Sequence, residues 1–227
     1  MNTTATTMNQ ARFNMIEQQI RPWDVLDAQV LELLERVRRE DFVPIAHRAL
    51  AYADMELPLG AGASAVMLAP KVQAKLVQDL QLQPTDRVLE IGTGSGYTTA
   101  LLAQLAQQVT SLEINPALAQ QATQRLQTAG ITNAQVRTAD ACANGFAACQ
   151  IDGPFNAIVL GGSVAEVPAE LTALLAEGGR LIAIVGQAPM MRATLITRRG
   201  NSLSTSQPWD TVAPRLQHFA EPSRFAF

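Results

Sequence analysis

One segment constrains the fold of this chain more than any other: residues 87–97, which read RVLEIGTGSGY. The apolar run that ends at Ile91 predicts a buried strand, and the three glycines that follow predict a sharp turn into a helix. The first N–H groups of a helix have no partner within it and lie at the positive end of its dipole. We therefore expect a small molecule with a negatively charged group to lie against this turn.

Helices and strands alternate after the glycine turn. The expected elements are helix 97–106, strand 109–113, helix 116–129, strand 134–138, helix 141–149, strand 157–160, helix 168–176 and strand 180–185. This alternation is typical of an α/β fold with a parallel sheet and helices on both faces. Two further strands, 191–199 and 202–211, are separated only by Arg199-Gly200-Asn201, so they predict a C-terminal antiparallel hairpin that completes a mostly parallel seven-stranded sheet.

The N-terminal part lacks this alternation of helices and strands. Residues 1–10 are rich in Thr and Asn and are predicted to be flexible. Helices are expected over 11–20 and 26–39, and a third, over 71–82, precedes the glycine segment. At 227 residues the chain fits one sizeable α/β domain over 11–227, with a helical cap (11–69) and an α/β core (70–227).

Charge and composition limit the classes of partner that the chain is expected to bind. The net charge is −3, and the only lysines are Lys71 and Lys75, so nucleic acid is not expected as a partner. No apolar run approaches the roughly 18 residues of a membrane span, and no secretory signal is visible, which predicts a cytoplasmic protein without a membrane partner. Cys142 and Cys149 lack metal-ligand spacing, so no metal is expected. Nothing in the sequence indicates an oligomeric state.

Three carboxylates follow or precede the ends of predicted strands. Glu90 lies inside the strand before the glycines, Glu113 ends the next strand, and Asp140 comes just after the third. The carboxyl ends of neighbouring parallel strands border one crevice, so these groups are expected to form an acidic rim. A carboxylate at the position of Glu113 can accept hydrogen bonds from both ribose hydroxyls of an adenosine.

Two adenosine-containing ligands fit these features, NAD and S-adenosylmethionine. Dinucleotide enzymes prefer G-x-G-x-x-G, but Tyr97 stands where the last glycine would be. The pyrophosphate of NAD would be repelled by an acidic rim, whereas S-adenosylmethionine brings a sulfonium and an ammonium group. The sequence therefore favours S-adenosylmethionine and leaves an NAD enzyme as the alternative.

Several segments resemble one family. The run EIGTGSGY at 90–97 is similar to the cofactor motif of protein-L-isoaspartate O-methyltransferases. Three further segments resemble the same family: RREDFVP at 38–44, LPLG at 57–60 and AEGGRL at 176–181. The resemblance covers roughly residues 20–216. It implies a Rossmann-like methyltransferase fold, S-adenosylmethionine as cofactor, and methylation of the α-carboxylate of isoaspartyl residues in damaged peptides or proteins.

The resemblance also implies a set of site residues, with Glu113 on the ribose and Asp140 near the adenine. The implied cofactor-binding residues are Leu68, Glu90, Gly92, Thr93, Gly94, Gly96, Glu113, Ile114, Asp140 and Ala141. The implied substrate-binding residues are Leu59, Val66 and Leu68.

The chain departs from the family at one position close to the chemistry. The family segment T-I-S-x-P-x-M reads VMLAPKV at 66–72, and Pro70 fixes the alignment, so Leu68 stands where the family has a serine. The loss of that hydroxyl would cost on the order of 1–3 kcal/mol, or about ten- to a hundredfold in rate. Ala139 and Ala141 likewise flank Asp140 where the family often has glycines.

Three functional hypotheses stay open at this point. The chain is an isoaspartyl carboxyl methyltransferase, or a methyltransferase for a more apolar small-molecule acceptor that contacts Leu68 and Val66, or a cofactor-binding protein without catalysis. The first needs no general base, because a carboxylate is already ionised at neutral pH. His47 and His218, the only histidines, stand in no recognisable acid–base constellation, so no catalytic residue is assigned.

Overall fold

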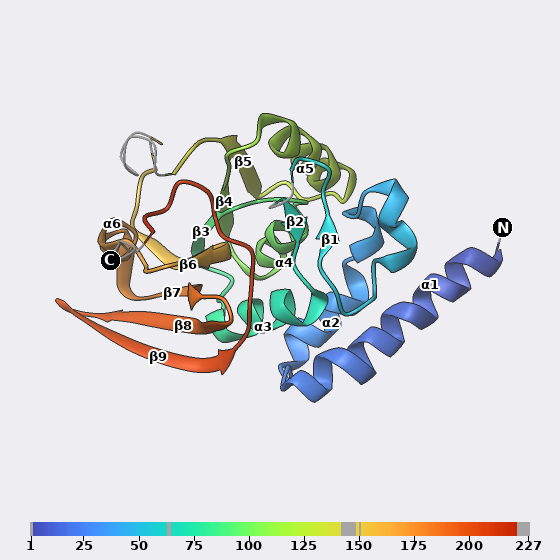
Figure 1. The fold of residues 1–227 in the computed structure, drawn as a ribbon, viewed down its shortest axis with the longest axis horizontal. Helices are drawn as coiled ribbons and strands as arrows, with labels where there is room; N and C mark the ends of the chain where they lie inside the picture. Colours follow the sequence, from blue (N-terminus) through green and yellow to red (C-terminus); the bar gives the residue numbers. More distant parts are fainter. Residues whose placement is uncertain (1, 63–64, 142–148, 150, 222–227) are drawn as a thin grey trace, which may run out of the picture.

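A seven-stranded sheet forms the centre of the molecule (Figure 1). The computed structural model describes residues 2–62, 65–141, 149 and 151–221. The strands are β3 (Arg87–Ile91), β4 (Gln108–Glu113), β5 (Ala134–Thr138), β6 (Phe155–Val164), β7 (Leu175–Gln187), β8 (Met190–Arg199) and β9 (Ser202–Asp210). Their order is β5-β4-β3-β6-β7-β8-β9. Strands β3 to β7 pair in parallel and β8 and β9 antiparallel, which confirms the predicted α/β fold with its C-terminal hairpin.

Helices and short helical turns surround this sheet. The α-helices are α1 (Asn2–Met15), α2 (Ala28–Arg36), α3 (Pro70–Leu80), α4 (Tyr97–Leu105), α5 (Pro116–Thr128) and α6 (Ala169–Ala173). The shorter turns are η1 (Ile16–Ile20), η2 (Arg21–Trp23), η3 (Arg39–Asp41) and η4 (Ile45–Leu50). A small separate hairpin, β1 (Leu57–Pro58) and β2 (Val66–Met67), precedes α3. Figure 1 shows the N-terminal helices at one end of the molecule and the β8–β9 hairpin at the other.

Two apolar cores lie on opposite faces of the sheet, because side chains alternate between the faces along each strand. Val88, Val109 and Val159 belong to the core shared with α2 to α5. Leu89 and Ile158 belong to the second core, which also contains residues of α6 and of the C-terminal segment. After β9 the chain returns to the centre of the sheet, where the Ser163 N–H donates to the Pro214 carbonyl (2.7 Å) and the Leu216 N–H to the Ser163 carbonyl (2.9 Å).

The N-terminus differs from the prediction. Helix α1 begins at Asn2, whereas the predicted helix begins at residue 11. A segment rich in Thr and Asn lacks the apolar periodicity that predicts a helix. Polar side chains support this one locally, since Arg12 donates to Asn9 (2.7 Å) and Gln10 to Asn14 (2.9 Å). The flexibility of residues 1–10, and the division into a cap and a core, stay predictions.

Other boundaries shift by a few residues. Helix α2 begins two residues later than expected because the Asp27 side chain caps it, accepting from the N–H groups of Gln29 and Val30, and it ends at Arg36 and not at residue 39. Helix α6 is shorter than 168–176 because β7 begins at Leu175. The helix expected over 141–149 falls, except at its two ends, outside the described residues, as does Cys142.

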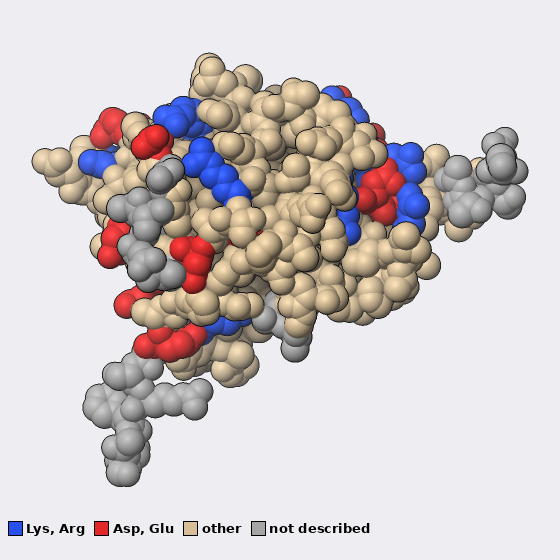
Figure 2. Space-filling view, turned by 90° about the horizontal axis from the view of Figure 1, so that it is seen from above, with Lys and Arg blue, Asp and Glu red and all other residues tan. Residues whose placement is uncertain are grey.

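Charged groups of both signs are scattered over one face of the molecule (Figure 2). On the face seen in Figure 2, Lys and Arg side chains lie interspersed with Asp and Glu, with a largely uncharged centre between them. This face therefore offers no continuous basic surface of the kind that binds a polyanion. Among the described residues, no helix combines the length and the apolar character needed to cross a bilayer.

Candidate active site

The glycine segment forms the turn that its sequence predicted. Strand β3 ends at Ile91, and α4 begins at Tyr97 after a loop in which Gly92, Gly94 and Gly96 have φ values of +92°, +54° and +85°. These values lie in the left-handed region, which side chains other than glycine rarely adopt. Gly96 also lies close to α5, where an added Cβ would come within 3.2 Å of the Ala122 Cβ. The loop therefore needs glycine both for its conformation and for its packing.

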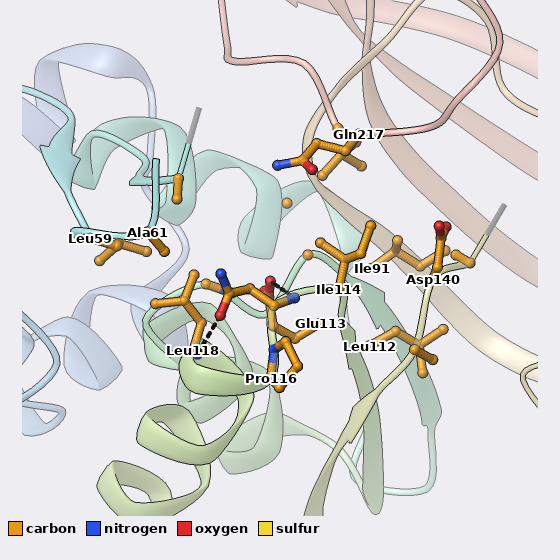
Figure 3. A pocket seen from close by; sticks show the side chains of 18 of the residues that line it. Leu59, Ala61, Ile91, Leu112, Glu113, Ile114, Pro116, Leu118, Asp140 and Gln217 are labelled. Atoms are coloured by element: carbon orange, nitrogen blue, oxygen red, sulfur yellow. Dashed lines mark hydrogen bonds between the residues drawn. The ribbon is translucent and has the colours of Figure 1, made fainter. Parts of the chain in front are cut away.

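A cavity of about 300 Å³ lies at the carboxyl ends of β3, β4 and β5 (Figure 3). This is the edge at which open α/β sheets bind ligands, and the volume is at the lower end for small-molecule sites. Figure 3 shows Leu59 and Ala61 on one side, Asp140 on the other, and Gln217 across the cavity from Glu113. Eight predicted site residues line it: Leu59, Val66, Gly92, Gly94, Glu113, Ile114, Asp140 and Ala141.

Glu113 joins the glycine loop to the start of α5. Its Oε2 accepts from the Gly94 N–H (2.8 Å), and its Oε1 accepts from the Asn115 N–H (3.0 Å). The side chain is buried, yet it lines the cavity. A carboxylate oxygen can accept more than one hydrogen bond, so both oxygens retain a free acceptor position. The geometry fits a carboxylate that is held rigidly by backbone donors while it binds two further hydroxyl groups.

The opposite wall contains a contact that sequence reasoning missed. The Nδ1 atom of His218 lies within hydrogen-bonding distance of the Asp140 carboxylate. Leu216 and Gln217, from the same C-terminal segment, also line the cavity. No local pattern could link His218 to Asp140, because they are far apart in sequence and meet only where the chain returns to β6. Arg215 lines the cavity too, with its Nε paired to the Glu221 carboxylate (2.8 Å).

Glu90 does not stand on the rim where the sequence placed it. Alternation along β3 directs Val88 and Glu90 to the α4 side, where Glu90 is fully buried. Its Oε2 accepts from the Ser111 hydroxyl (2.6 Å) and the Thr99 hydroxyl, and its Oε1 has no hydrogen-bond partner in the described part of the chain. Burial raises the pKa of this carboxyl to about 7, although both hydroxyl donors favour the charged form.

Three other predicted site residues do not line the cavity either. The Thr93 hydroxyl is buried and forms a hydrogen bond with the Ser111 hydroxyl (2.5 Å). Gly96 is the N-cap residue of α4. Leu68 belongs to the apolar core, with 5% of its surface exposed. Leu68 lies between β2 and α3, and Val66, two residues earlier, lines the cavity in its place.

The lining can hold a positively charged methyl donor with an adenosine. Two carboxylates, Glu113 and Asp140, face the cavity, and a third carboxyl, Glu90, lies behind the glycine loop. Gly161 completes the cradle, because an added Cβ there would come within 2.4 Å of the Gly92 carbonyl oxygen. Within residues 2–62, 65–141, 149 and 151–221, no group of three or more His, Cys, Asp or Glu side chains is arranged to hold a metal ion.

Solved structures share this architecture. A Plasmodium falciparum structure described as a protein-L-isoaspartate O-methyltransferase, in complex with S-adenosyl-L-homocysteine, matches with a TM-score of 0.77 and 22% identity. The match covers 93% of this chain and 98% of that one. A second structure named protein-L-isoaspartate O-methyltransferase matches with a TM-score of 0.74 over 93% of this chain and 67% of its own. Both matches show that the chain has the Rossmann-like methyltransferase fold.

The chain belongs to the protein-L-isoaspartate(D-aspartate) O-methyltransferase (PCMT) family, whose model matches residues 10–213. It is 38% identical over 203 residues to protein-L-isoaspartate O-methyltransferase 2 of Marinobacter nauticus, covering 89% of this chain and 90% of the relative. It is 41% identical over 182 residues to protein-L-isoaspartate O-methyltransferase 1 of Rhodopseudomonas palustris, covering 80% and 72%. The predicted resemblance is confirmed, and Leu216, Gln217 and His218 lie beyond the family match.

Proposed function

We propose that this chain is an S-adenosylmethionine-dependent O-methyltransferase that methylates the α-carboxylate of L-isoaspartyl residues in peptides or proteins. The observation that carries the proposal is the attachment of Glu113 to the glycine loop through Gly94, at the edge of an acid-lined cavity. Membership of the PCMT family and the names of the relatives support the choice of acceptor.

Each wall of the cavity has a part in this proposal. The two oxygens of Glu113 would bind the ribose hydroxyls, Asp140 and Ala141 would flank the adenine, and the loop at Gly92 and Gly94 would receive the amino-acid end of the cofactor; all of them line the cavity. Ile114, which follows Glu113 and also lines the cavity, would pack beside the adenosine. Leu59 and Val66 face the acceptor and keep water from it.

The reaction needs alignment more than proton transfer. When bound, S-adenosylmethionine supplies a methyl group on a positively charged sulfur, and the acceptor oxygen takes the methyl while the sulfur keeps the electron pair of the broken bond. An isoaspartyl carboxylate has an ordinary pKa near 4 and is ionised at neutral pH, so the chain needs no general base. The task of the residues is therefore to hold oxygen, methyl and sulfur in line, which supplies most of the rate.

Methyl transfer to matched peptides tests the proposal. The protein is incubated with S-adenosylmethionine carrying a labelled methyl group and with two peptides that differ only in an isoaspartyl or an aspartyl residue. We expect at least about tenfold more base-labile methyl ester on the isoaspartyl peptide, because only that peptide presents an α-carboxylate on a side branch. Equal labelling of the two peptides, or no labelling by a protein that binds S-adenosylhomocysteine, would contradict the assigned acceptor.

A second prediction concerns Leu68, at the position of the family serine. Because this side chain packs in the core, Leu68→Ser is expected to cost about 2 kcal/mol of unfolding free energy, through a cavity and a newly buried hydroxyl. Its turnover on the isoaspartyl peptide, measured well below the melting temperature, should stay within about threefold of the parent. A gain of tenfold or more would mean that residue 68 reaches the reaction centre after all.

A further inference from the structure

Arg39 is the largest of the fully buried side chains in the described structure. Its guanidinium donates to three neutral acceptors: the Ala51 carbonyl (2.8 Å), the Leu68 carbonyl (2.7 Å) and the Gln73 side-chain oxygen. Burial lowers the pKa of Arg39 to about 10, so the group is still charged at neutral pH. Among the described residues no carboxylate pairs with it. A buried charge of this kind is costly unless its donors are satisfied in a fixed geometry, so the guanidinium must be held tightly in place.

The three acceptors belong to three different segments of the chain. Ala51 follows η4, Leu68 lies between β2 and α3, and Gln73 is on α3. Gln73 extends this hydrogen-bond network to α4, because its side-chain amide donates to the hydroxyl of Thr98 (2.7 Å), at the start of that helix. The Arg39 guanidinium carbon also lies 5.1 Å from the centre of the Tyr97 ring. Arg39 thus links the N-terminal segments and the β2–α3 connection to the first residues after the glycine loop.

The segment held at Leu68 continues directly into the acceptor side of the cavity. Val66 lines the cavity and pairs with Pro58 in the β1–β2 hairpin. This hairpin rests on the glycine loop: a Cβ added at Gly94 would come within 3.3 Å of a Leu59 methyl and 3.9 Å of the Val66 carbonyl oxygen. The glycine loop and the hairpin form adjoining walls of the cavity, and Arg39 contacts the residue that follows each of them: it donates to the Leu68 carbonyl after β2 and lies against the Tyr97 ring after the loop.

We propose that Arg39 is a positioning residue, which fixes the β1–β2 wall at its distance from the glycine loop and so aligns the acceptor with the methyl donor. This inference rests on the proposed function for its kinetic consequence. Arginine suits the task because its planar fork of donors reaches several acceptors at fixed angles, whereas lysine offers a single flexible ammonium. A misplacement of about 1 Å in a displacement reaction can cost on the order of a hundredfold in rate.

The test compares Arg39→Lys with Arg38→Lys in the full chain. Arg38 is the matched control: it is the neighbouring arginine, its side chain is more than half exposed, and it pairs with the buried Glu40 carboxylate (3.2 Å) and the exposed Asp41 carboxylate (3.4 Å), contacts that a lysine ammonium can keep. For Arg39→Lys we expect kcat on the isoaspartyl peptide to fall at least tenfold while the Kd for S-adenosylhomocysteine stays within about twofold. Arg38→Lys should leave both values unchanged. An unchanged kcat in Arg39→Lys, or a parallel loss of S-adenosylhomocysteine binding, would overturn the positioning role.

Hydrogen exchange gives a readout that does not depend on turnover. With S-adenosylhomocysteine bound, Arg39→Lys should speed amide exchange at least tenfold in the peptide covering residues 57–69 and leave residues 108–113 of β4 unchanged. Uniform acceleration over both regions would mean a merely structural role and would overturn the inference. If Arg39→Lys does not fold, Thr98→Val cuts the same linkage more gently and should raise exchange over 57–69 about threefold. An inactive parent with this exchange pattern would reject the isoaspartyl acceptor and keep the role of Arg39.

Discussion

Replacement of Glu113 by alanine is expected to weaken binding of S-adenosylhomocysteine at least a hundredfold. The change removes the acceptors of the Gly94 and Asn115 N–H groups and, in the proposed complex, those of both ribose hydroxyls. A hydrogen bond to a charged group contributes about 1.5–3 kcal/mol, and the loss of two gives roughly 3 kcal/mol or more, which corresponds to about a hundredfold in Kd. Calorimetric titration of the protein with S-adenosylhomocysteine measures the effect.

Two further variants separate the role of this carboxylate from a general effect of charge. Glu113→Gln keeps one acceptor oxygen and should lose an intermediate amount of affinity. Glu170→Ala removes an exposed carboxylate on α6 and should leave the Kd unchanged. If Glu113→Ala bound S-adenosylhomocysteine within threefold of the parent, the cavity at the ends of β3, β4 and β5 would not be the cofactor site.

The parts of the fold that the sequence predicted well are those where local pattern and tertiary packing agree. The strand bounds predicted from the sequence match those of β5, and they match those of β3 and β4 to within one residue. The cap at Asn115 and the proline that follows it fixed the start of α5. The part of helix α1 before residue 11 was not predicted, because its mostly polar residues show no apolar periodicity.

The sequence predicted the site residues that stand at the ends of strands. It did not predict which residues line the cavity where this depends on the face of the strand to which the side chain points. Glu113 and Asp140 reach the cavity because each stands at or beyond the carboxyl end of its strand. Glu90 lies one residue earlier than the strand end, so alternation turns it away from the ligand and under α4. The return of the chain from β9 to β6, which brings His218 to Asp140, follows from packing over a long sequence separation and has no local signature.

The buried position of Glu90 has its own consequence for stability. In the unfolded chain this carboxyl has its ordinary pKa of 4.5, whereas burial raises it to about 7 in the folded protein. Between these two values the folded state keeps a proton that the unfolded chain releases. Stability is therefore lost as the pH rises from about 4.5 to 7, and the total loss is on the order of 3 kcal/mol at pH 8.

Glu90→Gln is accordingly expected to raise the melting temperature of the ligand-free protein at pH 8 by about 6–12 °C and to change it little at pH 4.5. Glutamine stays neutral at every pH, and the hydroxyls of Thr99 and Ser111 can rotate to pair with its amide. Thermal unfolding of parent and variant at both pH values measures the difference, with Glu35→Gln on the exposed face of α2 as control. An equal shift of the melting temperature at both pH values would mean that Glu90 is ionised throughout, held by its hydroxyl donors in spite of burial.

The Glu90→Gln change should also weaken binding of the positively charged donor at pH 8 more than binding of its demethylated product, because an ionised Glu90 behind the glycine loop attracts the sulfonium.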